Sequence, residues 1–219
     1  MKYFLSLFLF ISLYSCNQKQ TDPQTEIKDS TVNNPDASTG DNLITETSFG
    51  KINKSTSYAD LLTIFGKKNL QDTVDYGPEA LDTFIVTKIY SNTPREIVVK
   101  WQRDKFHNAI GTVECYQENS PYQTTDSVKV GSTLEKLVQA NGKKINFYGT
   151  GWDYGGLVTS YNNGKYEKSD IFFFLNSRDD AGEEIMGDRE LHTNMAVVKT
   201  NIKKLYIAKI SLSLHNEPR

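Results

Sequence analysis

The sequence predicts an α+β fold of two tandem repeats, each a short helix or helical hairpin packed on an antiparallel β-meander. First, residues 52–68 align without a gap with residues 128–144, and both segments carry one apolar stripe at helical spacing. Second, apolar and polar residues alternate in the segments that follow each helix, which is the period of a half-buried strand. Third, clusters of Asn, Gly and Pro separate these segments, as turns between strands would.

Each predicted helix begins at a capping residue and ends at a glycine. In both copies an acidic residue follows a serine at the spacing of a capping box: Ser57 with Asp60, and Ser132 with Glu135. Gly66 and Gly142 lie where a left-handed residue would end the helix. The apolar stripe of the first helix is Tyr58, Leu61, Leu62 and Phe65, and that of the second is Leu134, Leu137 and Val138, with Asn141 in the fourth place.

Strands are expected after both helices. They are, in the first copy, residues 83–90, 95–102 and 110–116, and in the second copy, residues 156–161, 169–175 and 205–214. The turn cluster 91–94 predicts that the first two strands of copy one form a hairpin. Asn163-Gly164, a strong short hairpin signal, predicts the same for copy two.

The second copy also carries a family resemblance. Val128-Lys129-Val130-Gly131-Ser132-Thr133, followed by Leu137 and a glycine-ended helix, is similar to the small outer-membrane assembly lipoproteins of the SmpA/OmlA type and to the tandem β-lactamase inhibitor protein. This resemblance implies a helical hairpin on one face of an antiparallel sheet, and two such units in a row in the inhibitor. The chain departs from the family at Gly66 and Gly142, which precede Lys where Pro is frequent. Because these families share a fold and no function, the resemblance predicts the fold alone.

The start of the chain has the features of an export signal followed by a lipid attachment site. Lys2 precedes the apolar run 3–13, so residues 1–15 are predicted to be a signal peptide. Leu13-Tyr14-Ser15-Cys16 resembles the bacterial lipobox, which implies that Cys16 becomes the first residue of the mature chain and carries acyl groups. An ordinary secretory signal with a chance cysteine is the alternative.

Four segments are expected along the chain. After the signal peptide, residues 16–47 comprise the lipidated cysteine and a disordered tether, because no aromatic residue occurs from Asn17 to Thr47 and polar residues predominate. Residues 48–122 and 123–219 are the two α+β repeats. The predicted location is the bacterial cell envelope, at the outer membrane. Since the lipid uses Cys16, Cys115 has no partner and is expected to be a buried, inert thiol.

Composition and motifs exclude several classes of function. Twenty-five basic and twenty-seven acidic residues give a formal charge of −2, which provides no positive field for a nucleic-acid partner. His107, His192 and His215 are isolated and lack metal-ligand spacing, and no catalytic motif occurs. Neither a metal, a cofactor nor enzymatic activity is therefore expected. The acidic stretch 179–188 is interpreted as a solvated loop.

The stretch 147–156 (FYGTGWDYGG) is the candidate binding site. Its glycines permit tight backbone, and Tyr148, Trp152 and Tyr154 alternate with small residues, so a ligand could lie across these rings. Asp153 would accept a hydrogen bond from a hydroxyl or a basic group. The other interpretation is a twisted strand and bend whose aromatic side chains cover the core.

These observations predict a non-enzymatic, lipid-anchored envelope protein of binding type, with a protein or glycan ligand on the sheet and the aromatic loop. A structural or assembly lipoprotein of the outer membrane is the alternative. A hydrolase that uses Asp153 or the acidic stretch is a third class.

Overall fold

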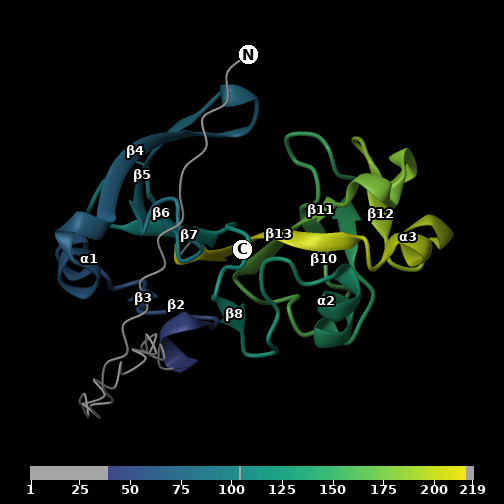
Figure 1. Ribbon diagram of the computed structural model, residues 1–219, viewed down its shortest axis with the longest axis horizontal. Helices are drawn as coiled ribbons and strands as arrows, with labels where there is room; N and C mark the ends of the chain where they lie inside the picture. The colour runs from purple at the N-terminus through teal and green to yellow at the C-terminus, as the bar shows by residue number, and fades with distance from the viewer. Residues whose placement is uncertain (1–38, 104, 216–219) are drawn as a thin grey trace, which may run out of the picture. The chain divides into compact units, whose positions relative to one another are not determined.

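The protein has an α+β fold, as the sequence predicts. The computed structural model describes residues 39–103 and 105–215. These residues contain the α-helices α1 (Tyr58–Phe65), α2 (Leu134–Asn141) and α3 (Ala196–Asn201), with most of the remaining regular structure in antiparallel sheets (Figure 1). Short 3-10 helices are η1 (Thr39–Asn42), η2 (Lys67–Asn69), η3 (Pro78–Ala80), η4 (Asp179–Ala181) and η5 (Glu183–Ile185). No helix in the described ranges combines the length and hydrophobicity that crossing a membrane requires.

The largest sheet has six strands in the order β11-β13-β7-β6-β5-β4, each antiparallel to its neighbours. The strands are β4 (Leu70–Tyr76), β5 (Thr83–Ile89), β6 (Ile97–Trp101), β7 (Ile110–Cys115), β11 (Ile171–Ser177) and β13 (Leu205–Ser213). All but β4 are predicted from alternation. Strand β4 is not predicted, because its aliphatic residues, Leu70 and Val74, are four positions apart, which is a helical spacing.

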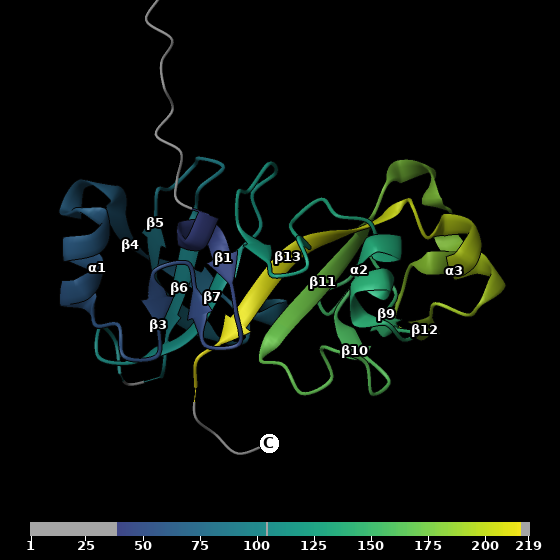
Figure 2. The same cartoon turned by 90° about the horizontal axis from the view of Figure 1, so that it is seen from below.

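Two smaller sheets complete the fold. The first has the order β3-β2-β1-β8 and consists of β1 (Leu43–Ile44), β2 (Ser48–Phe49), β3 (Ile52–Asn53) and β8 (Gln123–Thr124). The second has the order β10-β9-β12 and consists of β9 (Asn146–Tyr148), β10 (Val158–Ser160) and β12 (Glu190–His192). Figure 2 shows α2 and α3 beside the second sheet, and α1 beside β4 and β5.

Helix α1 begins and ends close to the predicted positions. The Ser57 hydroxyl accepts a hydrogen bond from the Asp60 amide at 3.2 Å, and the Asp60 carboxylate accepts one from the Ser57 amide at 2.9 Å, so the capping box is confirmed. These bonds hold the pKa of Asp60 below its usual value. Gly66 has a positive φ of 79°, although its ψ of 135° places it outside the left-handed helical region predicted for it.

The start of α2 differs by one residue from the prediction. Thr133 caps the helix by accepting a hydrogen bond from the Lys136 amide at 3.3 Å, whereas Ser132 accepts one from the preceding Lys129 at 3.1 Å. The predicted Ser132–Glu135 capping box is therefore wrong, because the Ser132 hydroxyl is used by the turn before the helix. Gly142 ends α2 in the left-handed conformation, as predicted.

The predicted tether extends too far into the folded part. Residues 39–42 form η1, and Leu43 and Ile44 pair in parallel with Gln123 and Thr124 of β8. Ile44 is fully buried. The polar composition of residues 16–47 conceals this short apolar pair, which gains its stability from a strand distant in sequence. Cys16, the signal peptide and the tether before residue 39 lie outside the described residues.

The second predicted hairpin forms only in part. Strand β10 pairs with β9, and the chain meets β11 through a single bridge between Leu157 and Phe174. A hydrogen bond of 2.7 Å from the Leu175 amide to the Gly156 carbonyl supports that bridge. The segment between β10 and β11 is not a two-residue turn, because side chains of α2 and of the 124–126 turn bind it.

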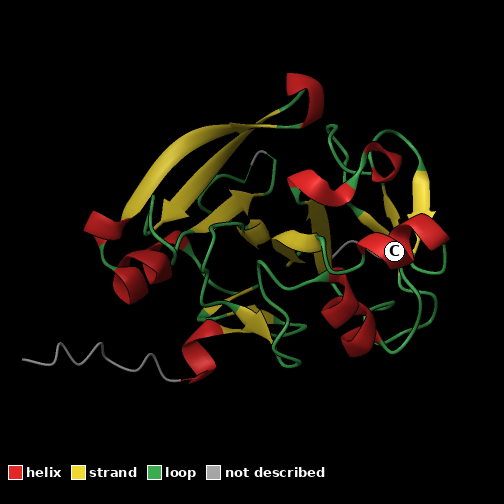
Figure 3. Ribbon diagram, turned by 45° about the vertical axis from the view of Figure 1, so that its right-hand side comes forward, coloured by secondary structure: helices red, strands yellow, loops and turns green. Residues whose placement is uncertain are grey.

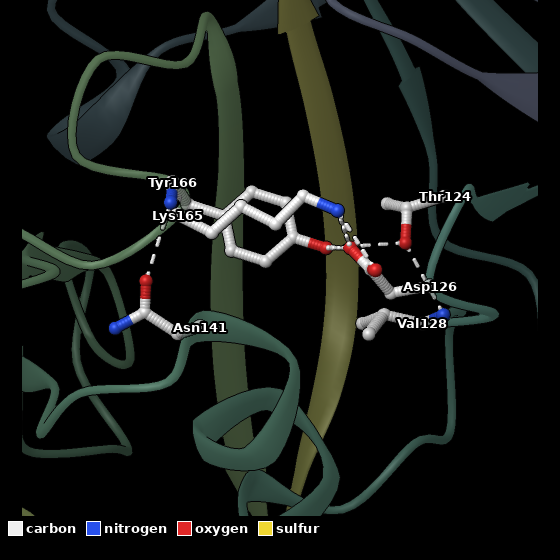
Figure 4. Close-up of polar contacts among 6 residues, drawn as sticks. All are labelled: Thr124, Asp126, Val128, Asn141, Lys165 and Tyr166. Carbon is white, nitrogen blue, oxygen red and sulfur yellow. Dashed lines mark hydrogen bonds and ion pairs between the residues drawn. The ribbon is translucent and has the colours of Figure 1, made fainter.

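Figure 4 shows how these side chains hold the segment after β10. Asn141, at the end of α2, accepts a hydrogen bond from the Tyr166 amide and donates to the Tyr161 carbonyl at 2.9 Å. On the other side of the Tyr166 ring, the Asp126 carboxylate accepts hydrogen bonds from the Tyr166 hydroxyl at 2.8 Å and from Lys165 at 2.6 Å. Lys165 and Tyr166 together keep the pKa of Asp126 below its usual value, against the opposing effect of burial.

Strands from both sides of the expected 122/123 boundary share the large sheet. Strand β13 pairs with β7, with Ile210 opposite Cys115 and Leu212 opposite Val113. In Figure 1, β13 (yellow) lies between β7 and β11. One continuous apolar core follows, which contains buried side chains of both halves, including Leu61, Ile89, Val113, Leu137, Phe173 and Leu212.

Candidate functional site

A hollow of about 1140 Å³ lies over one face of the large sheet. Its floor is formed by β6, β7 and β13, and its sides by the β4–β5 turn and the loop that carries Asp153. Phe84, Lys100 and Glu114 are among its lining residues. We call this space the sheet hollow. It is large enough to hold a small molecule or a segment of a chain.

Charged side chains of β6, β7 and β13 lie on the floor of the sheet hollow, and Asp75 of β4 pairs with one of them. Lys100 Nζ lies 3.1 Å from Asp75 Oδ2 and 3.3 Å from Glu114 Oε2. Lys209 Nζ lies 3.7 Å from Glu114 Oε1. We call Asp75, Lys100, Glu114 and Lys209 the charge strip. Glu114 is only 7% exposed, so one buried carboxylate is shared by two lysines.

The two lysines of the charge strip differ in their electrostatic environment. Burial opposes the charged form of Lys100, but Glu114 and Asp75 outweigh this and raise its pKa above the usual value. Burial lowers the pKa of Lys209, because Glu114 compensates less completely and Lys100 repels its charge. Lys209 also lies over the Phe174 ring, with Nζ 3.8 Å from the ring centroid. Lys209 is therefore the less completely neutralised of the two cations.

The turn of the long β4–β5 hairpin meets the loop 149–156 at one end of the sheet hollow. The Glu79 amide donates a hydrogen bond of 2.8 Å to Asp153 Oδ2. On the same turn, Asp82 pairs with Arg103, which follows β6; Arg103 Nη2 lies 2.7 Å from Asp82 Oδ1. Figure 3 shows this hairpin as the long yellow ribbon with a helical turn at its tip. Two segments 74 residues apart thus meet through the predicted site residue Asp153.

The other predicted site residues form a cluster of rings. Trp152 lies 5.7 Å from the Tyr148 ring and 5.4 Å from the Tyr154 ring, between centroids. The Trp152 indole donates its N–H to the Gly149 carbonyl at 2.8 Å, and Tyr154 is 45% exposed. Phe147, at the start of the same stretch, is fully buried in the core. The stretch therefore combines both interpretations: Phe147 packs, Asp153 lines the sheet hollow, and the three rings form one half-exposed cluster.

Sequence reasoning misses the charge strip. Lys100 stands in the strand IVVKW and Glu114 in the strand IGTVEC, each a charge within an otherwise uncharged strand. That pattern is a usable signal, because a charge is costly on a buried strand unless it is paired or faces a cavity. The pairing itself is not readable, since it depends on the register that places Lys100 opposite Thr112 and Glu114 opposite Ser211.

His107 packs between two aromatic rings. The Tyr58 ring stacks on it at 3.5 Å and the Phe106 ring at 3.7 Å, between centroids. Its Nε2 lies 3.2 Å from Asp72 Oδ2, an ion pair when the imidazole is protonated, although the N–H is not aligned for a hydrogen bond. In the described ranges, no group of three or more His, Cys, Asp or Glu side chains is arranged to hold a metal ion.

Cys115 is a buried, free thiol, as predicted. Burial raises its pKa to about 12, against a smaller opposite effect of the hydrogen bond with Ser120. At pH 8 nearly all of it is the unreactive thiol, and the fraction of thiolate falls further as the pH decreases.

We therefore expect iodoacetamide at pH 8 to leave Cys115 unmodified in the folded protein and to alkylate it once urea unfolds the chain. Mass spectrometry of the peptide that contains Cys115 measures this separately from Cys16. Equal rates of alkylation in the two states would contradict the buried placement.

Comparisons with known proteins identify no family. No protein-family model matches the chain, and no curated protein matches it significantly. Among solved structures, it is similar to the uncharacterized protein yfeY from Escherichia coli, with 13% sequence identity and a TM-score of 0.44, over 77% of this chain and 97% of that one. A likeness at this level transfers neither a ligand nor residue roles.

Proposed function

We propose that this chain is a non-enzymatic binding protein of the bacterial cell envelope, anchored by lipid on Cys16, whose ligand lies in the sheet hollow. The ligand is a segment of protein or of glycan. The observation that carries this proposal is the sheet hollow itself, about 1140 Å³ over a floor of partly buried charges.

The charge strip is better explained by recognition than by stability. Removing charges from water is costly, and replacing a buried ion pair by apolar residues is often neutral or stabilising. If the charge strip served only to hold the sheet together, Lys100, Glu114 and Lys209 would therefore contribute little to the free energy of folding. Beneath a hollow, the same groups can pair with polar groups of a ligand.

Lys209, on the floor, has bonding capacity left for a ligand. Its Nζ lies 3.7 Å from the Glu114 carboxylate, beyond the usual hydrogen-bond distance. A ligand with carbonyl, hydroxyl or carboxylate oxygens would satisfy this ammonium group, which fits a peptide backbone or a sugar.

The ring cluster of Tyr148, Trp152 and Tyr154 extends this surface at the side where Asp153 lines the sheet hollow. A half-exposed aromatic cluster beside a polar floor is a common composition of binding sites. We infer that the rings contact the part of the ligand that leaves the sheet hollow.

The test is site-specific photo-cross-linking of the full chain in cells. A benzoylphenylalanine at Thr112 is on the floor of the sheet hollow, and one at Thr200, exposed on α3, is the matched control. We expect an adduct with one protein from Thr112 only, and its loss when Lys209→Met is added. Two results would contradict a ligand in the sheet hollow. One is equal formation of adducts from both positions. The other is the absence of an adduct from Thr112 combined with failure of the chain to retain isolated cell-wall glycan.

The role of the ring cluster has its own test. Trp152→Ala and Tyr154→Ala are expected to weaken formation of the Thr112 adduct while urea unfolding stays cooperative. An undiminished adduct in folded variants would show that the ligand does not contact the rings. The sheet hollow would then remain the proposed site.

A structural or assembly lipoprotein of the outer membrane is the second candidate. It is favoured by the exposed apolar side chains of the β4–β5 hairpin, of which Leu81 is 78% exposed and Tyr76 64%. In that case the Thr112 adduct would be with a membrane-embedded protein complex.

The anchor is tested separately from the ligand. Metabolic labelling with palmitate should mark the chain and should be lost in Cys16→Ala, because the proposed acyl groups are attached at that residue. Labelling that persists in Cys16→Ala would exclude the anchor without affecting the sheet hollow.

We also propose that the two repeats arose by duplication. Helices α1 and α2 both precede strands of the large sheet, β4, β5, β6 and β7 after α1, and β11 and β13 after α2. The last large-sheet strands of the two halves, β7 and β13, are antiparallel neighbours, as equivalent strands related by a local twofold axis would be. Residues 39–122 and 123–215, expressed as separate chains, are then expected to reassemble when mixed; two chains that remain unfolded together would oppose this.

A further inference from the structure

Strand β4 is the outer strand of the large sheet, and part of its backbone faces outward. The Tyr90 amide donates to the Asn69 carbonyl, and the Gly77 amide to the Asp82 carbonyl. In an antiparallel pair, hydrogen-bonded positions alternate with outward-facing ones. The backbone groups of Asp72 and Val74 therefore point away from β5, at the free edge.

The outer half of the β4–β5 hairpin also exposes apolar surface. Val74 and Ile85 are directly opposite each other and are 51% and 47% exposed. Tyr76 is on the same face of β4, two residues along. An exposed edge with apolar side chains beside it is a template for another strand.

The acidic residues of β4 do not protect this edge. Edge strands often carry charges that repel a second strand. Here the Asp72 carboxylate is held by hydrogen bonds from the hydroxyls of Thr87 at 2.6 Å and Tyr58 at 3.3 Å. Asp75 pairs with Lys100 on the opposite face of the sheet. Both carboxylates are thus directed onto the protein's own side chains.

We infer that β4 pairs with β4 of a second copy of this chain, antiparallel and centred on Thr73. This register pairs the strand over its whole length, Leu70–Tyr76. Asp72 lies opposite Val74 of the other copy, and each such pair exchanges both of its backbone hydrogen bonds. The two large sheets become one continuous sheet across the twofold axis.

The match of facing residues supports a second copy as the occupant. In this register no carboxylate is opposite a carboxylate, because Asp72 meets Val74 and Asp75 meets Gln71, whose side-chain amide can donate to it. Thr73 meets Thr73, a favourable cross-strand pair. A shift of one step to centre on Asp72 would place two carboxylates opposite each other and lose this match. The inference depends on the edge of β4 and not on the sheet hollow.

The register predicts a specific disulfide. Thr73 of the two copies would form a non-hydrogen-bonded pair, with Cβ atoms about 4.5–5.5 Å apart. In the full chain, Thr73→Cys should give a disulfide-linked dimer under mild oxidation. Gln71→Cys is the matched control: it lies on the same edge and face, but two Gln71 residues would be offset by four positions, about 13 Å, too far for a disulfide. The unsubstituted chain reports any contribution of Cys16 and Cys115.

A second variant distinguishes specific pairing from collision. Val74→Asp in the Thr73→Cys chain places a carboxylate opposite Asp72, so we expect loss of the cross-linked dimer while the unfolding midpoint in urea changes little. Equal cross-linking of Thr73→Cys and Gln71→Cys, persistence of the dimer with Val74→Asp, or a Thr73→Cys adduct with a different protein would each overturn the inference.

Discussion

Gly156→Ala is expected to destabilise the protein by more than about 4 kcal/mol, in the range reserved for disrupted cores and strained backbone. Gly156 has a φ of +76°, and a Cβ atom built on it would lie within bonding distance of the Leu175 carbonyl. The obstruction is backbone, so no rotation of a side chain relieves it. The substitution would separate the chain before β10 from β11, where a single bridge joins them.

Gly187→Ala is the matched control for this prediction. Gly187 also has a positive φ, +91°, but a Cβ atom there would have no neighbour within 4 Å. Its substitution costs only the backbone strain of a left-handed residue, about 1 kcal/mol. Urea unfolding followed by circular dichroism measures both variants. Similar midpoints for the two would show that the chain at Gly156 can move away from β11 at low cost.

The Gly156 prediction also separates two explanations of a glycine-rich stretch. Glycine in 147–156 is compatible with an exposed loop that binds a ligand or with backbone that approaches another strand closely. Sequence alone cannot choose, because Leu175 is distant in sequence. The structure assigns Gly156 to close packing and leaves Tyr154 on the surface.

Strands and helices are predictable here where their signals are local. Both α1 and α2 follow from an apolar stripe between a capping hydroxyl and a glycine, and β5, β6, β7 and β13 follow from alternation. The α+β class follows from the order of these elements. The order of strands in the sheets does not, because it depends on pairings such as β13 with β7, which join residues about a hundred positions apart.

The candidate site is less predictable than the fold. Asp153 can be selected because it stands among aromatic residues and glycines. Its partner, the Glu79 amide, carries no side-chain signal at all. Lys100 and Glu114 become a pair only after β6 and β7 align. A site assembled across a sheet from separate strands is therefore visible in sequence only as isolated charges.

Asn163-Gly164 predicts a tight hairpin turn, yet Gly164 has a different role: a Cβ atom at that position would lie within 2.3 Å of the Asn141 side chain. The glycine makes room for Asn141, which in turn occupies the one polar position in the apolar stripe of α2.

Asn141→Ala is accordingly expected to destabilise the protein by about 2–4 kcal/mol, because it leaves buried backbone groups without partners. Asn141 is 2% exposed, and it donates to the carbonyls of Tyr161 and Lys143 at 2.9 and 3.1 Å. Its carbonyl oxygen accepts from the Tyr166 amide at 3.2 Å. Alanine makes none of these three bonds, and the segment between β10 and β11 would be left attached to the end of α2 by the backbone hydrogen bond of 2.9 Å from the Lys165 amide to the carbonyl of residue 141.

Lys165→Met tests whether the loss is specific to the buried amide. Lys165 belongs to the same cluster, but its ion pair with Asp126 is at the surface, where such pairs contribute about 0–1 kcal/mol. Urea unfolding of the two variants should therefore give a large shift for Asn141→Ala and a small one for Lys165→Met. Shifts of equal size would mean that the surface pair holds the segment as strongly as the buried amide, and that the polar residue in the helix stripe is dispensable. The expected difference would instead establish that a buried asparagine fixes the segment at which sequence reasoning placed a simple turn.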